Sequence, residues 1–177
     1  MISFKPTEAE LHLAASVGAL RQIWAKRNGL RHTGNHSQAG GFEQHINGAL
    51  GEMMLAKYRN VFWSGTIGTT CAAADVGLIY QVRATAHRDG KLLLRPGDKA
   101  DQPYVLARVL LPDVNLVGWL WGHEAMLPIH QRENERGTVF LAWPLHDMET
   151  LPDEAATMPV PASDFPGDRP RNGERLL

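Results

Sequence analysis

Residues 74–95 read ADVGLIYQVRATAHRDGKLLLR, an apolar stretch that carries polar side chains at a fixed spacing. Asp75 stands at its head, and Gln81 and Arg83 follow, two residues apart. Because side chains alternate between the two faces of a strand, Gln81 and Arg83 share one face while Val82 lies on the other. The stretch therefore predicts a strand with one polar face, headed by an acidic residue.

Beyond Trp63 the sequence is β-rich, with short runs of branched and aromatic residues separated by Gly, Pro and Asp. Five such runs are GLIYQVRAT (77–85), KLLLR (91–95), PYVLARVLL (103–111), NLVGWLWG (115–122) and TVFLAW (138–143). Because the connections are short, we expect antiparallel hairpins.

Two amphipathic helices precede these runs. The first spans Pro6 to about Lys26 and the second about Phe42 to Arg59, with Glu52 beside the apolar stripe of the second. The stripes are Leu13, Val17, Leu20 and Trp24 in the first, and Phe42, Ile46, Ala49 and Met53 in the second. Two helices followed by strands predict an α+β fold, with the helices covering a mainly antiparallel or mixed sheet of about five strands.

The bulk composition fits one soluble domain. The chain has 177 residues, and its 18 basic and 19 acidic side chains give a net charge of -1, so no global basic field is present. Residues 1–151 form the expected domain, whereas 152–177 hold five of the eleven prolines and predict an extended or mobile tail. We expect a cytoplasmic protein without a membrane span. The chain has a single cysteine, Cys71, and it has neither a basic leader nor an apolar run of about 20 residues.

The polar residues indicate a metal site. Mg²⁺, or Mn²⁺ in its place, prefers oxygen ligands. Asp75, the Gln81 side-chain oxygen and the Val82 main-chain carbonyl are candidate direct ligands, with Glu52 acting directly or through water. Such an ion polarises a phosphoryl oxygen and activates water, and the Arg83 guanidinium is suited to hold the phosphate.

At these residues the chain resembles the PD-(D/E)XK nuclease superfamily, which has the restriction-endonuclease-like fold. GALGEMMLAK (48–57), ADVG (74–77) and YQVRAT (80–85) follow the order of its helix Glu, its Asp and its strand motif. The likeness is greatest to small members encoded by bacteriophages and prophages, and it covers about residues 40 to 125. It implies Glu52, Asp75, Gln81 and Arg83 as catalytic residues, Mg²⁺ as cofactor and a host-cell cytoplasmic location.

The chain departs from that pattern at three points. Gln81 replaces the commoner carboxylate, Arg83 replaces the usual Lys, and the interval between Asp75 and Gln81 is short. One negative charge fewer predicts weaker Mg²⁺ affinity. Ordinary alternation on a half-buried strand, with Asp75 opening a turn, is an alternative interpretation of the same residues.

A local group of basic residues lies along the expected hairpin after Gln81. Arg88, Lys91, Arg95 and Lys99 are candidates to contact a nucleic-acid backbone, and DNA is the favoured partner. Hydrolysis of nucleic-acid phosphodiesters is therefore the favoured function, and relatives of this fold make a homodimer a further expectation. Two other functions stay open: a degraded nuclease fold that binds nucleic acid or protein in a phage, and a phage protein that occupies a host protein.

Overall fold

The computed structural model describes residues 1–30, 40–68, 73–134 and 137–154. Its elements are β1 (Ile2–Phe4), α1 (Glu8–Arg27), α2 (Gly40–Arg59), β2 (Gln81–Thr85), β3 (Leu92–Leu94), β4 (Pro103–Leu110), β5 (Asp113–Trp121), α3 (Gly122–Ala125), η1 (Pro128–His130), β6 (Gln131–Asn134), β7 (Gly137–Ala142) and η2 (Met148–Thr150). The predicted α+β class is confirmed. None of the described helices is long and apolar enough to cross a membrane.

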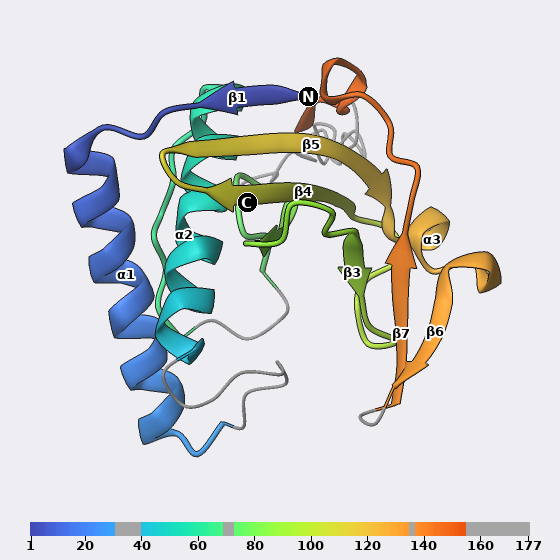
Figure 1. Cartoon of the computed structure of the whole chain (residues 1–177), viewed down its shortest axis with the longest axis horizontal. Helices are drawn as coiled ribbons and strands as arrows, with labels where there is room; N and C mark the ends of the chain where they lie inside the picture. The colour runs from blue at the N-terminus through green and yellow to red at the C-terminus, as the bar shows by residue number, and fades with distance from the viewer. Residues whose placement is uncertain (31–39, 69–72, 135–136, 155–177) are drawn as a thin grey trace, which may run out of the picture.

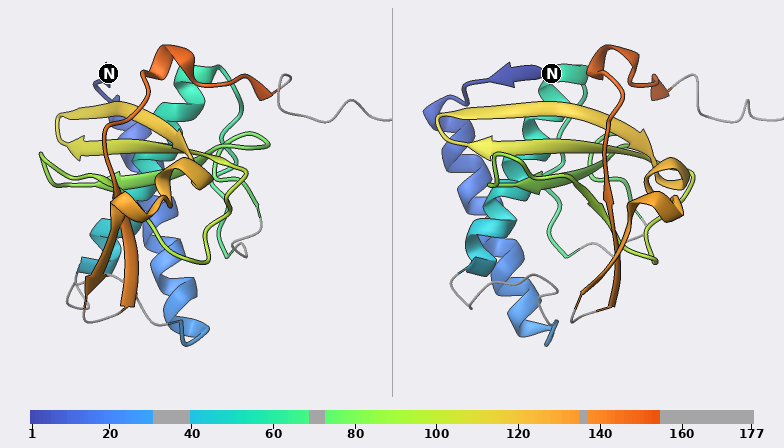
Figure 2. Two further views of the ribbon diagram at one scale, coloured as in Figure 1. Left: turned by 90° about the vertical axis from the view of Figure 1, so that its right-hand side faces the viewer. Right: turned by 45° about the vertical axis from the view of Figure 1, so that its right-hand side comes forward.

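The strands form two sheets rather than one. A four-stranded mixed sheet has the order β1-β5-β4-β2, with β2 parallel to β4, and a three-stranded antiparallel sheet has the order β3-β7-β6. The second sheet lies at the end of the molecule remote from α1 (Figures 1 and 2). The expectation that consecutive strands pair as hairpins holds for β4–β5 and is wrong for β2–β3, which lie in different sheets.

Helix α1 begins at a capping box. Thr7 is its N-cap: the Thr7 hydroxyl accepts a hydrogen bond from the Glu10 amide, and the Glu10 carboxylate accepts one from the Thr7 amide at 2.7 Å. This reciprocal pair satisfies two backbone donors that helix geometry leaves open. The helix therefore starts two residues after the expected Pro6, which precedes the cap.

The apolar face that α1 buries matches the expected one only in part, since Val17 is the one member of the expected stripe in the main core. Leu13 and Leu20 are 53% and 49% exposed, whereas small residues, including Ala14 and Gly18, are buried against α2. A side chain at Gly18 would place its Cβ 2.6 Å from the Ile46 Cα, so the two helices can approach this closely only with glycine there. Close helix packing, and not side-chain size, decides the buried face of α1.

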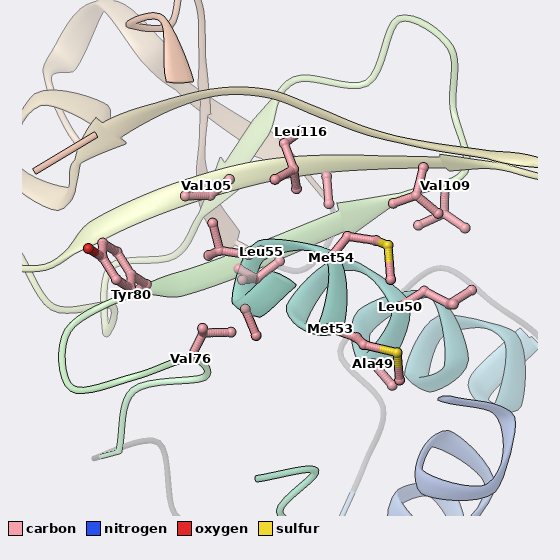
Figure 3. Packing of buried hydrophobic residues seen from close by; sticks show 14 of the residues in the cluster. Ala49, Leu50, Met53, Met54, Leu55, Val76, Tyr80, Val105, Val109 and Leu116 are labelled. Atoms are coloured by element: carbon pink, nitrogen blue, oxygen red, sulfur yellow. The ribbon is translucent and has the colours of Figure 1, made fainter. Parts of the chain in front are cut away.

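Helix α2 lies between α1 and the four-stranded sheet (Figure 1). Its residues from Ala49 to Ala56 are buried on all sides, and Gly51 lies directly against the Ala107 side chain of β4. Figure 3 shows Leu50, Met54 and Leu55 of this helix in the main core. Glu52 is thus an acidic residue on the most buried of the described helices.

Strand β4 separates two apolar cores. Its alternate residues Val105, Ala107 and Val109 pack in the main core with α2, while Tyr104 and Leu106 pack in a second core with β3 and β7. A strand buried on both faces reads as a nearly continuous apolar run, which is the pattern of residues 103–110. The parallel neighbour β2 likewise has one face toward the main core and one toward the second core. Its position therefore decides which core each polar side chain of β2 faces.

The end of the described chain returns to the domain. The Pro152 carbonyl accepts a hydrogen bond from the Tyr80 hydroxyl at 2.7 Å, Asp153 pairs with Arg59, and Glu154 accepts one from the Leu78 amide. These three residues therefore contact the packed domain. The rest of the predicted tail, 155–177, lies outside the described residues, as does Cys71.

Candidate metal and phosphate site at the edge of strand β2

Strand β2 directs Gln81 and Arg83 to one face and Val82 to the other. Gln81 is in register with Tyr104 and Arg83 with Leu106, so both polar side chains lie on the side of the second core. Val82 packs in the main core beneath α2. The predicted alternation on this strand is confirmed.

Asp75 reaches β2 through a tight turn. Val76 and Tyr80 form an isolated antiparallel bridge, and the Asp75 amide donates to the Tyr80 carbonyl at 2.9 Å. Gly77 has a φ of +57°, a left-handed value that glycine adopts without strain. The short interval between Asp75 and Gln81 is therefore closed by this turn, and the Asp75 Oδ2 accepts a hydrogen bond from the Val82 amide at 2.8 Å.

The Asp75 carboxylate is poorly compensated. Burial is the largest cause that raises its pKa, to about 6, and the negative charge of Glu52 raises it further, while the Val82 amide, Arg83 and Arg21 oppose the change. Its side chain is 32% exposed, so solvent still reaches it. An added cation beside Asp75 would remove the cost of holding this charge.

The amide of Gln81 is held in one orientation. Its Nε2 donates to the Ala73 carbonyl at 3.0 Å and to the Gln102 Oε1 at 2.9 Å. Both donor positions are therefore used, and the Oε1 accepts no hydrogen bond from any described residue. The side-chain oxygen is left as an acceptor of fixed orientation, which is the atom that the sequence predicted as a ligand.

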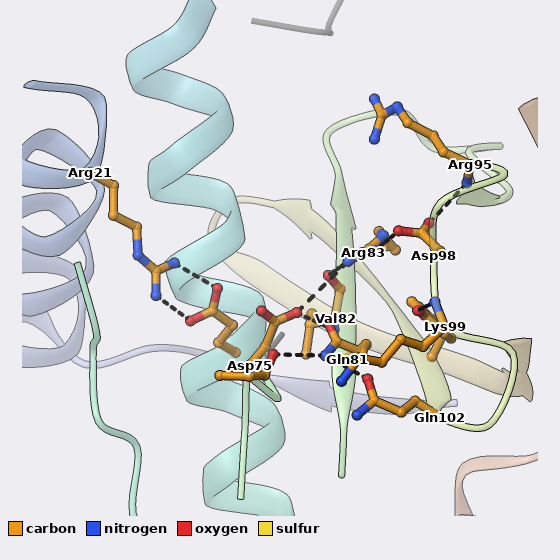
Figure 4. Close-up of polar contacts among 12 residues, drawn as sticks. Arg21, Asp75, Gln81, Val82, Arg83, Arg95, Asp98, Lys99 and Gln102 are labelled. Atoms are coloured by element: carbon orange, nitrogen blue, oxygen red, sulfur yellow. Dashed lines mark hydrogen bonds and ion pairs between the residues drawn. The ribbon is translucent and has the colours of Figure 1, made fainter. Parts of the chain in front are cut away.

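Arg83 is held from three sides. Its Nη2 donates to the Asp98 Oδ1 at 2.9 Å, its Nη1 donates to the Val82 carbonyl at 3.2 Å, and Nη1 lies 3.8 Å from the Asp75 Oδ2. The guanidinium also lies over the Tyr104 ring, 4.9 Å from its centroid. Arg83 is therefore a fixed cation next to Asp75 (Figure 4).

Glu52 approaches Asp75 from the α2 side of β2. Its two carboxylate oxygens accept hydrogen bonds from Arg21 Nη1 at 2.6 Å and Nη2 at 2.8 Å, and the Trp63 Nε1 adds a third at 3.0 Å. Glu52 and Asp75 interact through their charges without a direct bond. The four predicted residues thus form two halves, Glu52 on the side of α2 and Gln81 with Arg83 on the other side of β2, which meet at Asp75.

The four basic candidates divide between two connections. Arg95 and Lys99 belong to the β3–β4 connection, where the Arg95 amide donates to the Asp98 Oδ2 at 2.9 Å, beside Arg83. Arg88 and Lys91 belong to the β2–β3 connection, which is joined to β4 by the 3.0 Å hydrogen bond from Arg108 to the Gly90 carbonyl. The expected single basic hairpin is wrong, because β2 and β3 do not pair.

The oxygen atoms available at this site are of the type that a hard divalent cation prefers as ligands. Asp75 has a carboxylate oxygen that accepts no hydrogen bond from the described residues, and Gln81 has its oriented amide oxygen. In the described ranges no three His, Cys, Asp or Glu side chains come together as a metal-binding group. Mg²⁺ commonly binds through one or two protein ligands and keeps several waters, so a small donor set is compatible with it.

Several partners in this site were not predicted from the sequence. Arg21 and Trp63 hold Glu52, and Asp98 and Gln102 hold the side chains of β2. The one available signal was the position of Arg21, four residues after Val17 and four before Ala25 on the face of α1 that packs against α2. A charged residue on a buried helix face requires a partner of opposite charge. Which residue is that partner depends on how the two helices pack.

No protein-family model, no curated protein and no solved structure matches this chain. Its function must therefore be inferred from the chemistry of the site itself.

Proposed function

We propose that this chain hydrolyses phosphodiester bonds of nucleic acid, with DNA as the favoured substrate and Mg²⁺ as the cofactor. The observation that carries the proposal is the convergence of Asp75, Gln81 and Arg83 at the head of β2, with Glu52 beside them. An acidic oxygen and an oriented amide oxygen can bind a divalent ion, and a fixed guanidinium can hold the phosphate that the ion polarises.

Asp75 and Gln81 would hold the ion, with Asp75 supplying the charge. When bound there, Mg²⁺ polarises a phosphoryl oxygen and lowers the pKa of a bound water. Arg83 holds the phosphate and stabilises the charge that develops on it; the guanidinium stays protonated, so it is not a general base. Asp98 and Tyr104 fix Arg83, so that its remaining N–H groups require little reordering before a phosphate binds.

The Arg95 and Lys99 connection supports a polymeric substrate. Because Asp98 of this connection binds Arg83, a nucleic-acid backbone whose phosphate lies at Arg83 passes close to the connection. Contacts to adjacent phosphates give binding that weakens steeply with salt. These basic residues are proposed to bind the backbone and not to read sequence.

One observation favours the second candidate, a nuclease fold that binds nucleic acid without cleaving it. Each carboxylate of the site already has a guanidinium near it: Arg21 forms a bidentate pair with Glu52, and Arg83 lies 3.8 Å from Asp75. A guanidinium beside each carboxylate reduces the need for a metal. The two candidates differ in whether Asp75 is required.

The test is cleavage of single- and double-stranded DNA, and of RNA, with Mg²⁺, with Mn²⁺ and with a chelator. Wild type is compared with Asp75→Asn, which keeps an acceptor for the Val82 amide, and with Glu43→Gln, which removes an exposed carboxylate from the first turn of α2. Metal-dependent cleavage lost only in Asp75→Asn supports the hydrolase. Salt-dependent DNA binding without cleavage by any of the three supports the binding module instead.

A further inference from the structure

Arg21 occupies a position in the site that the nuclease interpretation does not assign. It reaches from α1 to Glu52 of α2 and binds both carboxylate oxygens, at 2.6 and 2.8 Å. Its Nε donates to the Thr66 carbonyl at 2.9 Å, so the guanidinium is held on two sides. A planar fork bound to a carboxylate on one side and a carbonyl on the other has little freedom to leave.

The Glu52 carboxylate is likewise held in place by its hydrogen bonds. Its side chain is 8% exposed and Arg21 is 18% exposed, and the neutral Trp63 indole adds a third donor to the carboxylate. A metal that bound Glu52 directly would compete with a half-buried, bidentate guanidinium for the carboxylate oxygens. Breaking a buried ion pair by removing one partner is strongly unfavourable.

The direction in which the Glu52 side chain extends also argues against Glu52 as a direct metal ligand. Gln81 and Arg83 lie on the side of β2 that faces the second core, whereas Glu52 extends from α2, which covers the main core on the opposite side. Asp75 stands at the strand edge between the two halves. A ligand set of Asp75 and Gln81 is therefore separate from the Glu52 carboxylate, which is turned to Arg21 and Trp63.

The charges near Asp75 support a single added ion. Glu52, Asp75 and Asp98 carry three negative charges, and Arg21 and Arg83 carry two positive charges. Burial alone would lower the pKa of Arg21, but hydrogen bonds to Glu52 and the charges of Glu52 and Asp75 raise it above its ordinary value, so Arg21 stays charged. Without Arg21 the same group would carry one more unbalanced negative charge, beside a vacated carboxylate.

We propose that Arg21 is a built-in second cation of this site: it neutralises Glu52 from within the protein, so the site takes one divalent ion, on Asp75 and Gln81, and Glu52 is not a direct ligand. The proposal rests on the proposed function. It assigns Arg21 and Glu52 as positioning residues that set the number of ions and the field at Asp75. It also replaces the expectation that Glu52 shares the metal.

The experiment is a calorimetric titration with Mn²⁺, together with electron paramagnetic resonance to detect a coupled pair of Mn²⁺ ions. Wild type is compared with Arg21→Gln, with Arg21→Lys and with the paired variant Arg21→Met/Glu52→Gln. The paired variant removes both charges, so no buried charge is left alone if Arg21→Gln folds poorly. Circular dichroism checks the fold of each variant.

We expect one ion in wild type, in Arg21→Lys and in the paired variant. Because the paired variant keeps Asp75 and Gln81 and the same local net charge, its affinity should stay within about threefold of wild type. Arg21→Gln should bind a second ion through Glu52, or bind the first about tenfold more tightly or better, because one positive charge is lost.

Three results would overturn the inference while leaving the hydrolase intact: two coupled ions in wild type, loss of binding in the paired variant, or unchanged binding in a folded Arg21→Gln variant. The first two would make Glu52 a ligand, and the third would remove Arg21 from the electrostatics of the site. Absence of Mn²⁺ binding in every folded variant, wild type included, would overturn both this inference and the metal-dependent function.

Discussion

The Asp75 carboxylate accepts the hydrogen bond of the Val82 amide, 2.8 Å away, at the open edge of β2. Because β2 is the last strand of its sheet, no further strand among the described residues accepts from that amide. Asp75 takes the place of the missing neighbour, and it does so with a charged group. The sheet edge is satisfied, while a half-buried negative charge is placed where a cation would be stabilised.

This charge predicts a pH dependence of stability. Burial first, and then the charge of Glu52, raise the pKa of Asp75 to about 6 in the folded protein, above the value of about 3.9 expected in an unfolded chain. Between these two values the folded state binds more protons than the unfolded state, so stability falls as the pH rises from about 4 to about 7 and is level above that. Asp75→Asn removes this dependence and should be more stable than wild type at pH 8, by about 1 to 3 kcal/mol.

Urea unfolding at several pH values checks this prediction. The advantage of Asp75→Asn should shrink as the pH falls and be nearly absent at pH 4, whereas Glu43→Gln should follow wild type throughout. Equal stability of Asp75→Asn and wild type at pH 8 would show that the charge is compensated.

The contact between α1 and α2 depends on Gly18. A Cβ at Gly18 would meet Ile46 backbone atoms at 2.6 Å, which no side-chain rotation relieves. We expect Gly18→Ala to destabilise the fold by about 1 to 3 kcal/mol despite the better helix propensity of alanine. Gly48→Ala on α2 is the matched control, because no heavy atom lies within 4 Å of its added Cβ, and it should stabilise by about 0.5 to 1 kcal/mol. Thermal unfolding of both variants distinguishes packing from propensity.

Local sequence patterns predicted the elements well and their partners poorly. The two helices and the five β-rich runs were found because their periodicity is a property of each segment. The parallel pairing of β2 with β4 was missed because pairing depends on residues far apart in the chain. Strand β6 was missed because its sequence, QREN, is polar and exposed and becomes a strand through its pairing with β7.

The same limit applies to the site. Asp75, Gln81 and Arg83 were predictable as neighbours because one short segment contains all three. Arg21 and Asp98 were not, since their contacts to Glu52 and Arg83 arise from helix packing and from the course of the β3–β4 connection. The buried face of α1 was mistaken because α1 offers two apolar stripes, and the stripe of small residues permits the closer approach to α2.

Asp98 should act through Arg83. Its Oδ1 accepts from Arg83 and its Oδ2 accepts from the Arg95 amide, so the carboxylate couples the cation to the turn at 95–98. If the chain is a nuclease, Asp98→Asn should lower kcat by about 10- to 100-fold, the usual effect of losing an outer partner of a site residue. Mn²⁺ affinity should stay within about threefold of wild type, because Asp98 is no ligand. Asp101→Asn, an exposed carboxylate of the same connection, is the control.

The two basic connections should contribute unequally to DNA binding. Arg95 and Lys99 lie beside Arg83, whereas Arg88 and Lys91 lie beyond the other end of β2. The slope of log Kd against log salt should fall by about 0.9 for each lost phosphate contact. We expect the larger fall, and the larger loss of affinity, in Arg95→Gln/Lys99→Gln than in Arg88→Gln/Lys91→Gln, measured by fluorescence anisotropy. A larger effect of the second pair would place the backbone along the β2–β3 connection.

Arg83 best distinguishes a hydrolase from a binding module. Its guanidinium is fixed by Asp98 and Tyr104 beside Asp75, so it is ready to meet charge on a phosphate. Loss of one charge-stabilising group in such a site slows turnover by about 100- to 1,000-fold, or about 3 to 4 kcal/mol. Arg83→Ala should therefore retain almost no metal-dependent cleavage, while Mn²⁺ binding persists because it depends on Asp75. Arg83→Lys should retain part of the activity, since it keeps the charge and loses the bidentate fork. The measurement is single-turnover cleavage at saturating metal by wild type, Arg83→Ala and Arg83→Lys, with folding checked by circular dichroism. Equal cleavage rates would remove Arg83 from the mechanism. DNA that all three proteins bind and none cleaves would favour the binding module.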